Sequence, residues 1–125
     1  MKELGGSVPF AHERLDVYKL ALDFAVLAND IVEALPRGRG HIRDQLARAS
    51  TSIVLNIAEG AAKFSGPDKR RYYLIAAGSA AECAAIIDVL GRLNLVTDAR
   101  REDGKRTLDR IAAMLVNLAK RHAQR

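Results

Sequence analysis

The chain has 125 residues, with 20 lysines and arginines against 15 aspartates and glutamates. A chain of this length forms one domain that buries enough surface to fold without disulfides or metals. Hydrophobic residues make up 49%, which excludes intrinsic disorder. The single cysteine, Cys83, excludes an intrachain disulfide framework and favours a reducing compartment. Because aromatic residues are only 5% and tryptophan is absent, a platform of aromatic rings that stack on bases is not expected.

Targeting and membrane signals are weak. Residues 1–10 contain no apolar stretch long enough for a signal peptide. The most apolar region, residues 72–90, is rich in alanine and is interrupted by Glu82 and Asp88, which favours a buried helix of a soluble protein over a membrane span. We therefore expect a cytoplasmic protein with no membrane partner, built from a flexible segment over residues 1–12 and one domain over residues 13–125.

Proline and glycine divide the chain into four amphipathic segments, and no alternating β-branched run predicts a strand. The first segment, residues 13–35, carries two adjacent apolar stripes at helical spacing. Such a wide face suits contact with two neighbouring helices, or with the core on one side and another subunit on the other. The stripes are Leu15, Tyr18, Leu22 and Ala25, and Val17, Leu20, Phe24, Leu27, Ile31 and Leu35.

The next two segments have clear stripes and one clear start. Ser65, with Pro67 in the first turn and Asp68 three positions on, predicts the beginning of the third helix. The alanines of residues 76–85 indicate close packing, either inside the domain or against another subunit. The predicted buried stripes are Ile42, Leu46, Ala49, Ile53 and Ile57 in residues 41–62, and Ile75, Ser79, Glu82, Ile86, Leu90 and Leu93 in the third helix.

The fourth segment begins at Thr97, a capping residue that is followed by an acid in the first turn. Gly104 weakens a helix by about 1 kcal/mol relative to alanine, so the helix could begin later. Four amphipathic helices with short connections predict an all-α fold, an antiparallel up-and-down four-helix bundle. The buried stripe of the fourth helix is predicted to be Leu108, Ile111, Leu115 and Leu118.

Charge is unevenly distributed along the chain, because the first segment is acidic and three later clusters are basic. Basic clusters attract the phosphate backbone of RNA or DNA without reading its sequence. The alternative is a solvated surface that only keeps the protein soluble. The candidate nucleic-acid-binding residues are Arg37, Arg39, Arg43, Lys69, Arg70 and Arg71 as one group, and Arg100, Arg101, Lys105 and Arg106 as a second.

Catalytic and metal-binding patterns are missing. No glutamate is followed three residues later by histidine, as a di-metal bundle requires, so we expect no metal, no cofactor and no catalytic residue. Glu59 and Glu82 would need partners if buried, which predicts a structural polar network; otherwise both carboxylates point to solvent at the bundle ends. The network residues are Arg14, Arg48, Ser52, Asn56, Glu59, Ser79 and Glu82.

Three stretches resemble one known family. Residues 45–60 read QLARASTSIVLNIAEG, residues 72–82 read YYLIAAGSAAE, and residues 14–18 read RLDVY. Together they resemble the signature of the four-helix-bundle proteins encoded in 23S rRNA intervening sequences. The network residues from Arg48 to Glu82 occupy signature positions of that family, and we interpret them as determinants of fold and assembly.

The resemblance implies a ring-forming bundle, commonly a homopentamer, for which no catalytic reaction is established. The fold is also similar to the accessory variability protein of diversity-generating retroelements. That likeness implies nucleic-acid binding through basic surfaces and a reverse transcriptase-like partner. We therefore expect a non-enzymatic homo-oligomer that binds RNA, DNA or a nucleoprotein partner. The alternative is a protein-interaction scaffold that binds no nucleic acid.

Overall fold

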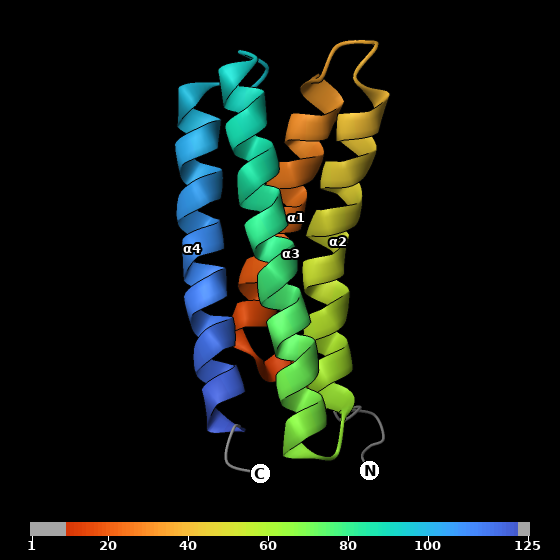
Figure 1. The fold of residues 1–125 in the computed structure, drawn as a ribbon, viewed down its shortest axis with the longest axis vertical. Helices are drawn as coiled ribbons and strands as arrows, with labels where there is room; N and C mark the ends of the chain where they lie inside the picture. Colours follow the sequence, from red (N-terminus) through yellow and green to blue (C-terminus); the bar gives the residue numbers. More distant parts are fainter. Residues whose placement is uncertain (1–9, 123–125) are drawn as a thin grey trace, which may run out of the picture.

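Four long helices form the molecule in the computed structural model, which describes residues 10–122 (Figure 1). They are α1 (Asp16–Ala34), α2 (Gly40–Ala62), α3 (Gly66–Arg92) and α4 (Asp98–Arg121), and a short 3-10 helix, η1 (Ala11–Arg14), precedes them. The predicted all-α four-helix bundle is confirmed. Most of the segment expected to be flexible, residues 1–12, lies outside the described residues.

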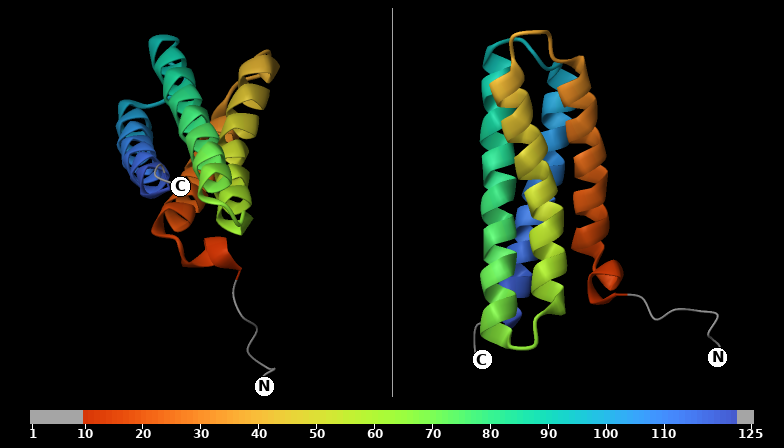
Figure 2. Two further views of the ribbon diagram at one scale, coloured as in Figure 1. Left: turned by 60° about the horizontal axis from the view of Figure 1, so that its bottom comes forward. Right: turned by 90° about the vertical axis from the view of Figure 1, so that its right-hand side faces the viewer.

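Successive helices run in opposite directions, so the two ends of the bundle differ (Figure 1). The α1–α2 and α3–α4 loops lie at one end, which we call the two-loop end. The α2–α3 loop lies at the other, the one-loop end, together with the start of α1 and the end of α4. Figure 2 shows the helices side by side along one axis, with η1 at the foot of α1, where it contacts α1 and α2.

Both predicted helix starts are present. The Asp68 amide donates to Ser65 Oγ at 3.2 Å, and the Arg100 amide donates to Thr97 Oγ1 at 3.2 Å. At the end of α3, Asn94 adopts a left-handed φ of 58°, and the Leu95 amide bonds to the Leu90 carbonyl at 2.9 Å. Asparagine tolerates this backbone region better than most residues, so it can turn the chain toward α4.

The predicted stripes of α1, α2 and α4 form most of the core. All five stripe residues of α2 are buried. On α1, Val17, Phe24 and Ile31 are buried, whereas Leu22 is 41% exposed because the other stripe faces partly outward. On α4, Leu108, Ile111 and Leu115 are buried and Leu118 is half-buried.

The predicted buried face of α3 is partly wrong. Ile86 and Leu90 are buried as predicted, and Ser79 is half-buried. Ile75, Glu82 and Leu93 are exposed, and the helix instead buries Tyr73 and a row of small side chains. The reason is that α3 makes its most extensive contacts with both α2 and α4, and close approach on two sides favours small residues over large ones. The inward row is Tyr73, Ala76, Ala80, Cys83, Ile86, Ile87 and Leu90.

Gly104 does not delay the start of α4, which begins at Asp98. The glycine is buried, and a Cβ at this position would lie 3.0 Å from Ile87 Cδ1. The missing side chain therefore lets α4 approach α3 closely, and this packing offsets the low helix propensity of glycine.

One helix of the described chain, α3, is long and apolar enough to cross a membrane by length and composition. A core helix of a bundle passes the same test. In the most apolar window of α3, 33% of the residues are buried inside the domain. The rest of this window forms an unusually apolar outer surface.

Candidate nucleic-acid interface

The candidate basic residues gather at the two opposite ends of the bundle rather than in the two groups expected. Arg37, Arg39 and Arg43 lie at the two-loop end with Arg100 and Arg101, because α2 and α4 both begin there (Figure 1). The cluster Lys69, Arg70 and Arg71 begins α3 at the one-loop end. A helix of 23 residues such as α2 separates these ends by roughly 35 Å. The structure therefore divides the first expected group and joins half of it to the second.

At the two-loop end, Arg43 has a structural role. Its Nη2 donates to the Leu35 carbonyl at 3.2 Å and to the Pro36 carbonyl at 3.4 Å, at the C-terminus of α1. A cation at this position satisfies carbonyls that the helix leaves unpaired and interacts favourably with its dipole. Arg37 is exposed and Arg39 half-buried.

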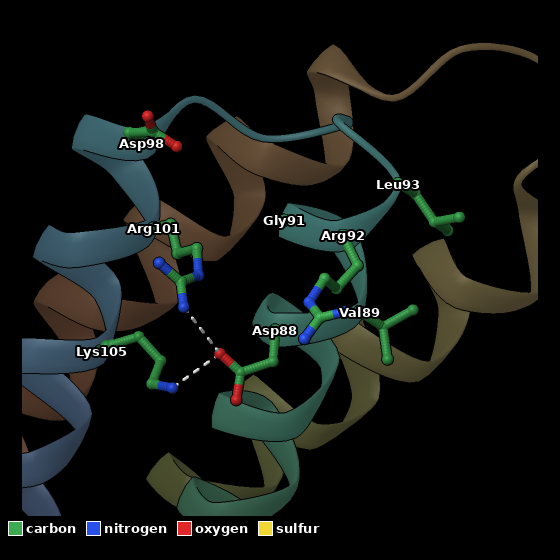
Figure 3. A pocket seen from close by; sticks show the side chains of 8 residues that line it. All are labelled: Asp88, Val89, Gly91, Arg92, Leu93, Asp98, Arg101 and Lys105. Atoms are coloured by element: carbon green, nitrogen blue, oxygen red, sulfur yellow. Dashed lines mark hydrogen bonds and ion pairs between the residues drawn. The ribbon is translucent and has the colours of Figure 1, made fainter.

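Beside the α3–α4 loop, Asp88 of α3 neutralises two of the α4 cations (Figure 3). Lys105 Nζ lies 2.7 Å and Arg101 Nη2 3.5 Å from Asp88 Oδ1. The hydrogen bond from Lys105 is the main cause that holds the pKa of Asp88 below its ordinary value. A Cβ on Gly91 would come within 2.8 Å of Arg101 Cδ, so the glycine makes room for this arginine.

These contacts surround an open hollow of about 740 Å³ between α3 and α4, which Arg92 also lines. Because one carboxylate compensates Arg101 and Lys105, they contribute less free positive charge than their number suggests. Arg106 lies 4.0 Å from Asp103, a distance at which an exposed pair contributes little to stability. Of the α4 candidates, Arg100 is exposed and forms no ion pair with another described residue.

At the one-loop end, Lys69 has the same role as Arg43, because it also donates to carbonyls at a helix C-terminus. Its Nζ donates to the Ala61 carbonyl at 2.9 Å and lies 3.5 Å from the Gly60 carbonyl, at the C-terminus of α2. Arg70 and Arg71 are exposed. The Arg71 guanidinium lies 5.3 Å from the centre of the Tyr72 ring, which is a cation–π distance.

The α2–α3 loop adds two residues to the predicted candidates, Lys63 and Phe64. Lys63 Nζ lies 5.0 Å from the centre of the Tyr72 ring and 3.1 Å from Glu59 Oε2. The hydrogen bond to Glu59 is the main cause that raises the pKa of Lys63 above its ordinary value. Phe64 is 103% exposed, so its ring has no covering partner within the described chain. The signal in the sequence was an aromatic residue placed between a lysine and a Ser-Gly-Pro turn.

The structure assembles only the uncharged half of the expected polar network. Ser52 Oγ of α2 and Ser79 Oγ of α3 lie 2.8 Å apart, and Asn56 Nδ2 donates to the Ser52 carbonyl at 2.9 Å and to Ser52 Oγ at 3.0 Å. The Ser52–Ser79 bond connects α2 to α3 at a half-buried position, and the Asn56 bonds within α2 hold Ser52 in place. Their position fixes the register of the two helices, because a shift of one turn would separate the hydroxyl groups.

The charged members of the expected network lie apart. Arg14, Arg48, Glu59 and Glu82 are all exposed, and within residues 10–122 neither arginine forms an ion pair with either glutamate. Glu59 binds Lys63 of its own helix end instead. Both carboxylates face solvent, Glu59 near the one-loop end and Glu82 in the middle of α3, because exposure costs less than burying a charge.

Glu59 and Glu82 also do not form a shared catalytic or metal site. The Ser52–Ser79 contact sets their levels along the bundle and separates them by about 15 Å at 1.5 Å per residue. Among the described residues, no three histidine, cysteine, aspartate or glutamate side chains gather as metal ligands. Cys83 is buried, and burial, with a smaller effect of Glu82, raises the pKa of its thiol to about 12.

Comparisons with known proteins agree with this architecture. A family model described as 23S rRNA-intervening sequence protein matches residues 13–117. A crystal structure of a protein with unknown function from the S23 ribosomal protein family of Bacteroides thetaiotaomicron is similar, with a TM-score of 0.77 and 25% sequence identity. The match covers 83% of this chain and 98% of that one. No curated protein matches.

Proposed function

Because this chain belongs to the 23S rRNA-intervening sequence protein family, we propose that it is a non-enzymatic, self-associating bundle that binds RNA in the cytoplasm. The RNA contacts are the basic residues at the bundle ends. The observation that carries the proposal is the convergence of basic residues from separate segments on these ends, where several have no acidic partner among the described side chains. Those residues are Arg37, Arg39, Arg70, Arg71, Arg92 and Arg100.

Electrostatics supports RNA as the ligand. A cation that is neither buried nor neutralised by a carboxylate is free to exchange its hydration for a phosphate oxygen, and this exchange releases counterions from the RNA. Arg43 holds the C-terminus of α1 and so orients the loop that carries Arg37 and Arg39, whereas Lys69 ties the C-terminus of α2 to the first turns of α3, which carry Arg70 and Arg71. Asp23, which is exposed in the middle of α1, repels RNA from the side of the bundle and directs it toward the ends.

Self-association is supported by exposed apolar side chains on two neighbouring helices. Leu55 of α2 is 60% exposed, and Ile75, Val89 and Leu93 of α3 are 41%, 48% and 44% exposed. We call these four residues the α2/α3 face. Leu55 and Ile75 lie at one level, because each is displaced from the Ser52–Ser79 contact toward the one-loop end. We propose that this face contacts a second copy of the chain in a homo-oligomer, for which the resemblance implies five copies.

The RNA proposal predicts that charge reversal at Arg70 and Arg71 weakens binding. In the double variant R70E/R71E, we expect the affinity for a single-stranded RNA to fall at least about tenfold at low salt. The slope of log K against log salt should decrease by about 1.4, because each lost contact with single-stranded RNA contributes about 0.7. Fluorescence anisotropy over a salt series measures both quantities.

The matched control is the double variant K19E/R110E, which changes the net charge equally at two exposed residues away from the basic clusters. Its slope should remain close to that of the wild-type protein. Equal losses in both variants would mean that net charge alone governs binding and would contradict an RNA interface at the ends. Wild-type protein that binds no RNA at low salt would overturn the proposal.

A protein-interaction scaffold is the alternative function, and the exposed α2/α3 face favours it. This alternative predicts a defined protein partner that remains bound after nuclease treatment, together with no measurable affinity for RNA at low salt. Substitution of Ile75 should then release the partner, whereas substitution of Arg70 and Arg71 should have no effect.

A further inference from the structure

We propose that Phe64 stacks on an unpaired base of the bound RNA, while Arg70 and Arg71 contact the adjacent phosphates. The inference rests on the proposed RNA binding and adds the chemical form of the ligand, a single-stranded segment. Apart from its Phe64 ring, the one-loop end is suited to phosphate contacts that any RNA could make. The ring distinguishes unpaired from paired bases, because bases within a duplex are already stacked.

Phe64 is the most exposed apolar side chain of the described residues, at 103%. It lies in the three-residue connection between Ala62, where α2 ends, and Gly66, where α3 begins. The residues on both sides are fixed. Lys63 donates its amide to the Gly60 carbonyl at 3.2 Å, and Ser65 caps α3. The backbone therefore presents the ring to solvent from a loop that is anchored at both ends, with both ring faces available.

Three basic residues, Lys63, Arg70 and Arg71, lie within seven positions of this ring in the sequence. Lys63 precedes it, and Lys63 Nζ and the Arg71 guanidinium lie 5.0 and 5.3 Å from the centre of one Tyr72 ring. Tyr72 thus holds two cations together at the base of the loop. The exposed Arg70 adds a third. The nearby acids are Asp68 and Glu59, and Glu59 binds Lys63. Residues 59–71 still contain more basic than acidic side chains.

The charge around the ring identifies the partner. A protein or a second copy of this chain that buried Phe64 would also have to desolvate the Lys63–Glu59 pair and the unpaired Arg70 and Arg71, and pairing these arginines would need a matching acidic surface. RNA can both cover the ring and pair with the cations, because its bases have π-faces and every nucleotide carries a phosphate. An aromatic ring among cations is the combination that binds single strands with little sequence preference.

The test compares Phe64 variants on a single-stranded RNA and on an RNA duplex of equal length. Phe64→Ala should weaken single-strand binding by about 5- to 140-fold, the range for loss of one base stack, and should leave duplex binding unchanged. Phe64→Leu keeps apolar area but has no π-face, so it should also weaken single-strand binding. Phe64→Tyr should retain it. Since the ring contacts no core residue, all variants should keep the thermal stability of the wild-type protein.

Phe64→Trp provides a direct signal, because the chain has no tryptophan of its own. Stacking on a base should quench the fluorescence of this tryptophan when single-stranded RNA is added. The matched control is Val116→Trp, at a 39% exposed position of α4, which should show no quenching. An abasic strand of the same length should bind through its phosphates without quenching either variant.

The outcomes separate this inference from the proposed function. If wild-type protein binds no RNA, both fail. If it binds RNA but Phe64→Ala binds the single strand equally well, only the stacking inference is overturned. If Phe64→Ala instead changes the mass of the protein in solution, the ring contacts a second copy of the chain, and this too overturns the inference.

Discussion

Replacing Phe24 with alanine is expected to lower the free energy of unfolding by about 3–5 kcal/mol. The Phe24 side chain is 0% exposed and lies where α1 meets Gly104 of α4, whose missing side chain leaves no atoms that could fill the cavity. Since domains of this size are stable by about 5–15 kcal/mol, the loss would remove a large part of the total. Urea unfolding followed by circular dichroism, at one fixed protein concentration, measures it as a shift of the midpoint at a constant slope.

The matched control is Val26→Ala on the same helix. Val26 is 64% exposed, so its loss leaves no internal cavity and should change the free energy of unfolding by at most about 0.5 kcal/mol. The two residues are two positions apart, so the helix propensity of α1 enters both measurements similarly. Comparable losses in the two variants would show that Phe24 is not a core residue.

Replacing Ile75 with glutamate is expected to convert the proposed oligomer into single chains of 13.6 kDa. Ile75 is 41% exposed in the single bundle, so the substitution costs the isolated fold little. In an assembly that covers the α2/α3 face, the new carboxylate would replace an apolar side chain and would lose its contact with water at this position. An unpaired buried charge is costly enough to prevent association. Sedimentation velocity at micromolar concentrations measures the mass.

Val116→Glu is the corresponding control, because Val116 is 39% exposed on α4, outside the α2/α3 face. It should leave the mass of the assembly unchanged. A wild-type protein that sediments as a single chain would overturn the proposed self-association. An Ile75→Glu variant that keeps the full mass would place the contact on another surface.

The sequence predicted the helices well because their ends depend on local chemistry. Ser65 and Thr97 cap the helices that follow them, and these bonds involve residues only three positions apart. The stripe of α2 was predicted correctly because this helix presents one clear apolar side to the core. Family membership was likewise predictable, since the signature stretches are long and contiguous.

The face of α3 was not predictable from periodicity alone. The spacing of its large apolar side chains predicted that these would face the core. Because α2 and α4 both pack closely against α3, small side chains take much of the buried face instead. The same limitation applies to Gly104, which appeared unfavourable for a helix until Ile87 was seen to pack against it. In both cases the packing partner is distant in the sequence, so neither the local apolar spacing nor the helix propensity of a single residue predicts the packing.

The basic residues were recognised from composition, but their roles were not. Lys69 and Arg43 bind helix ends that lie eight residues earlier in the chain, and Asp88 pairs with cations of the next helix. Such contacts decide which charges remain free for RNA. Phe64 was overlooked because one aromatic residue carries no pattern, and only its full exposure in the fold makes it noticeable.

Because Cys83 is buried, the rate at which its thiol is alkylated can measure how often the bundle opens. Because burial raises the pKa of this thiol to about 12, almost none of it is ionised at pH 8, so the folded chain should resist alkylation. Reaction requires α3 to separate from its neighbours, after which the thiol regains ordinary reactivity. The alkylation rate in native buffer therefore reports how often the centre of the protein opens, without any engineered probe.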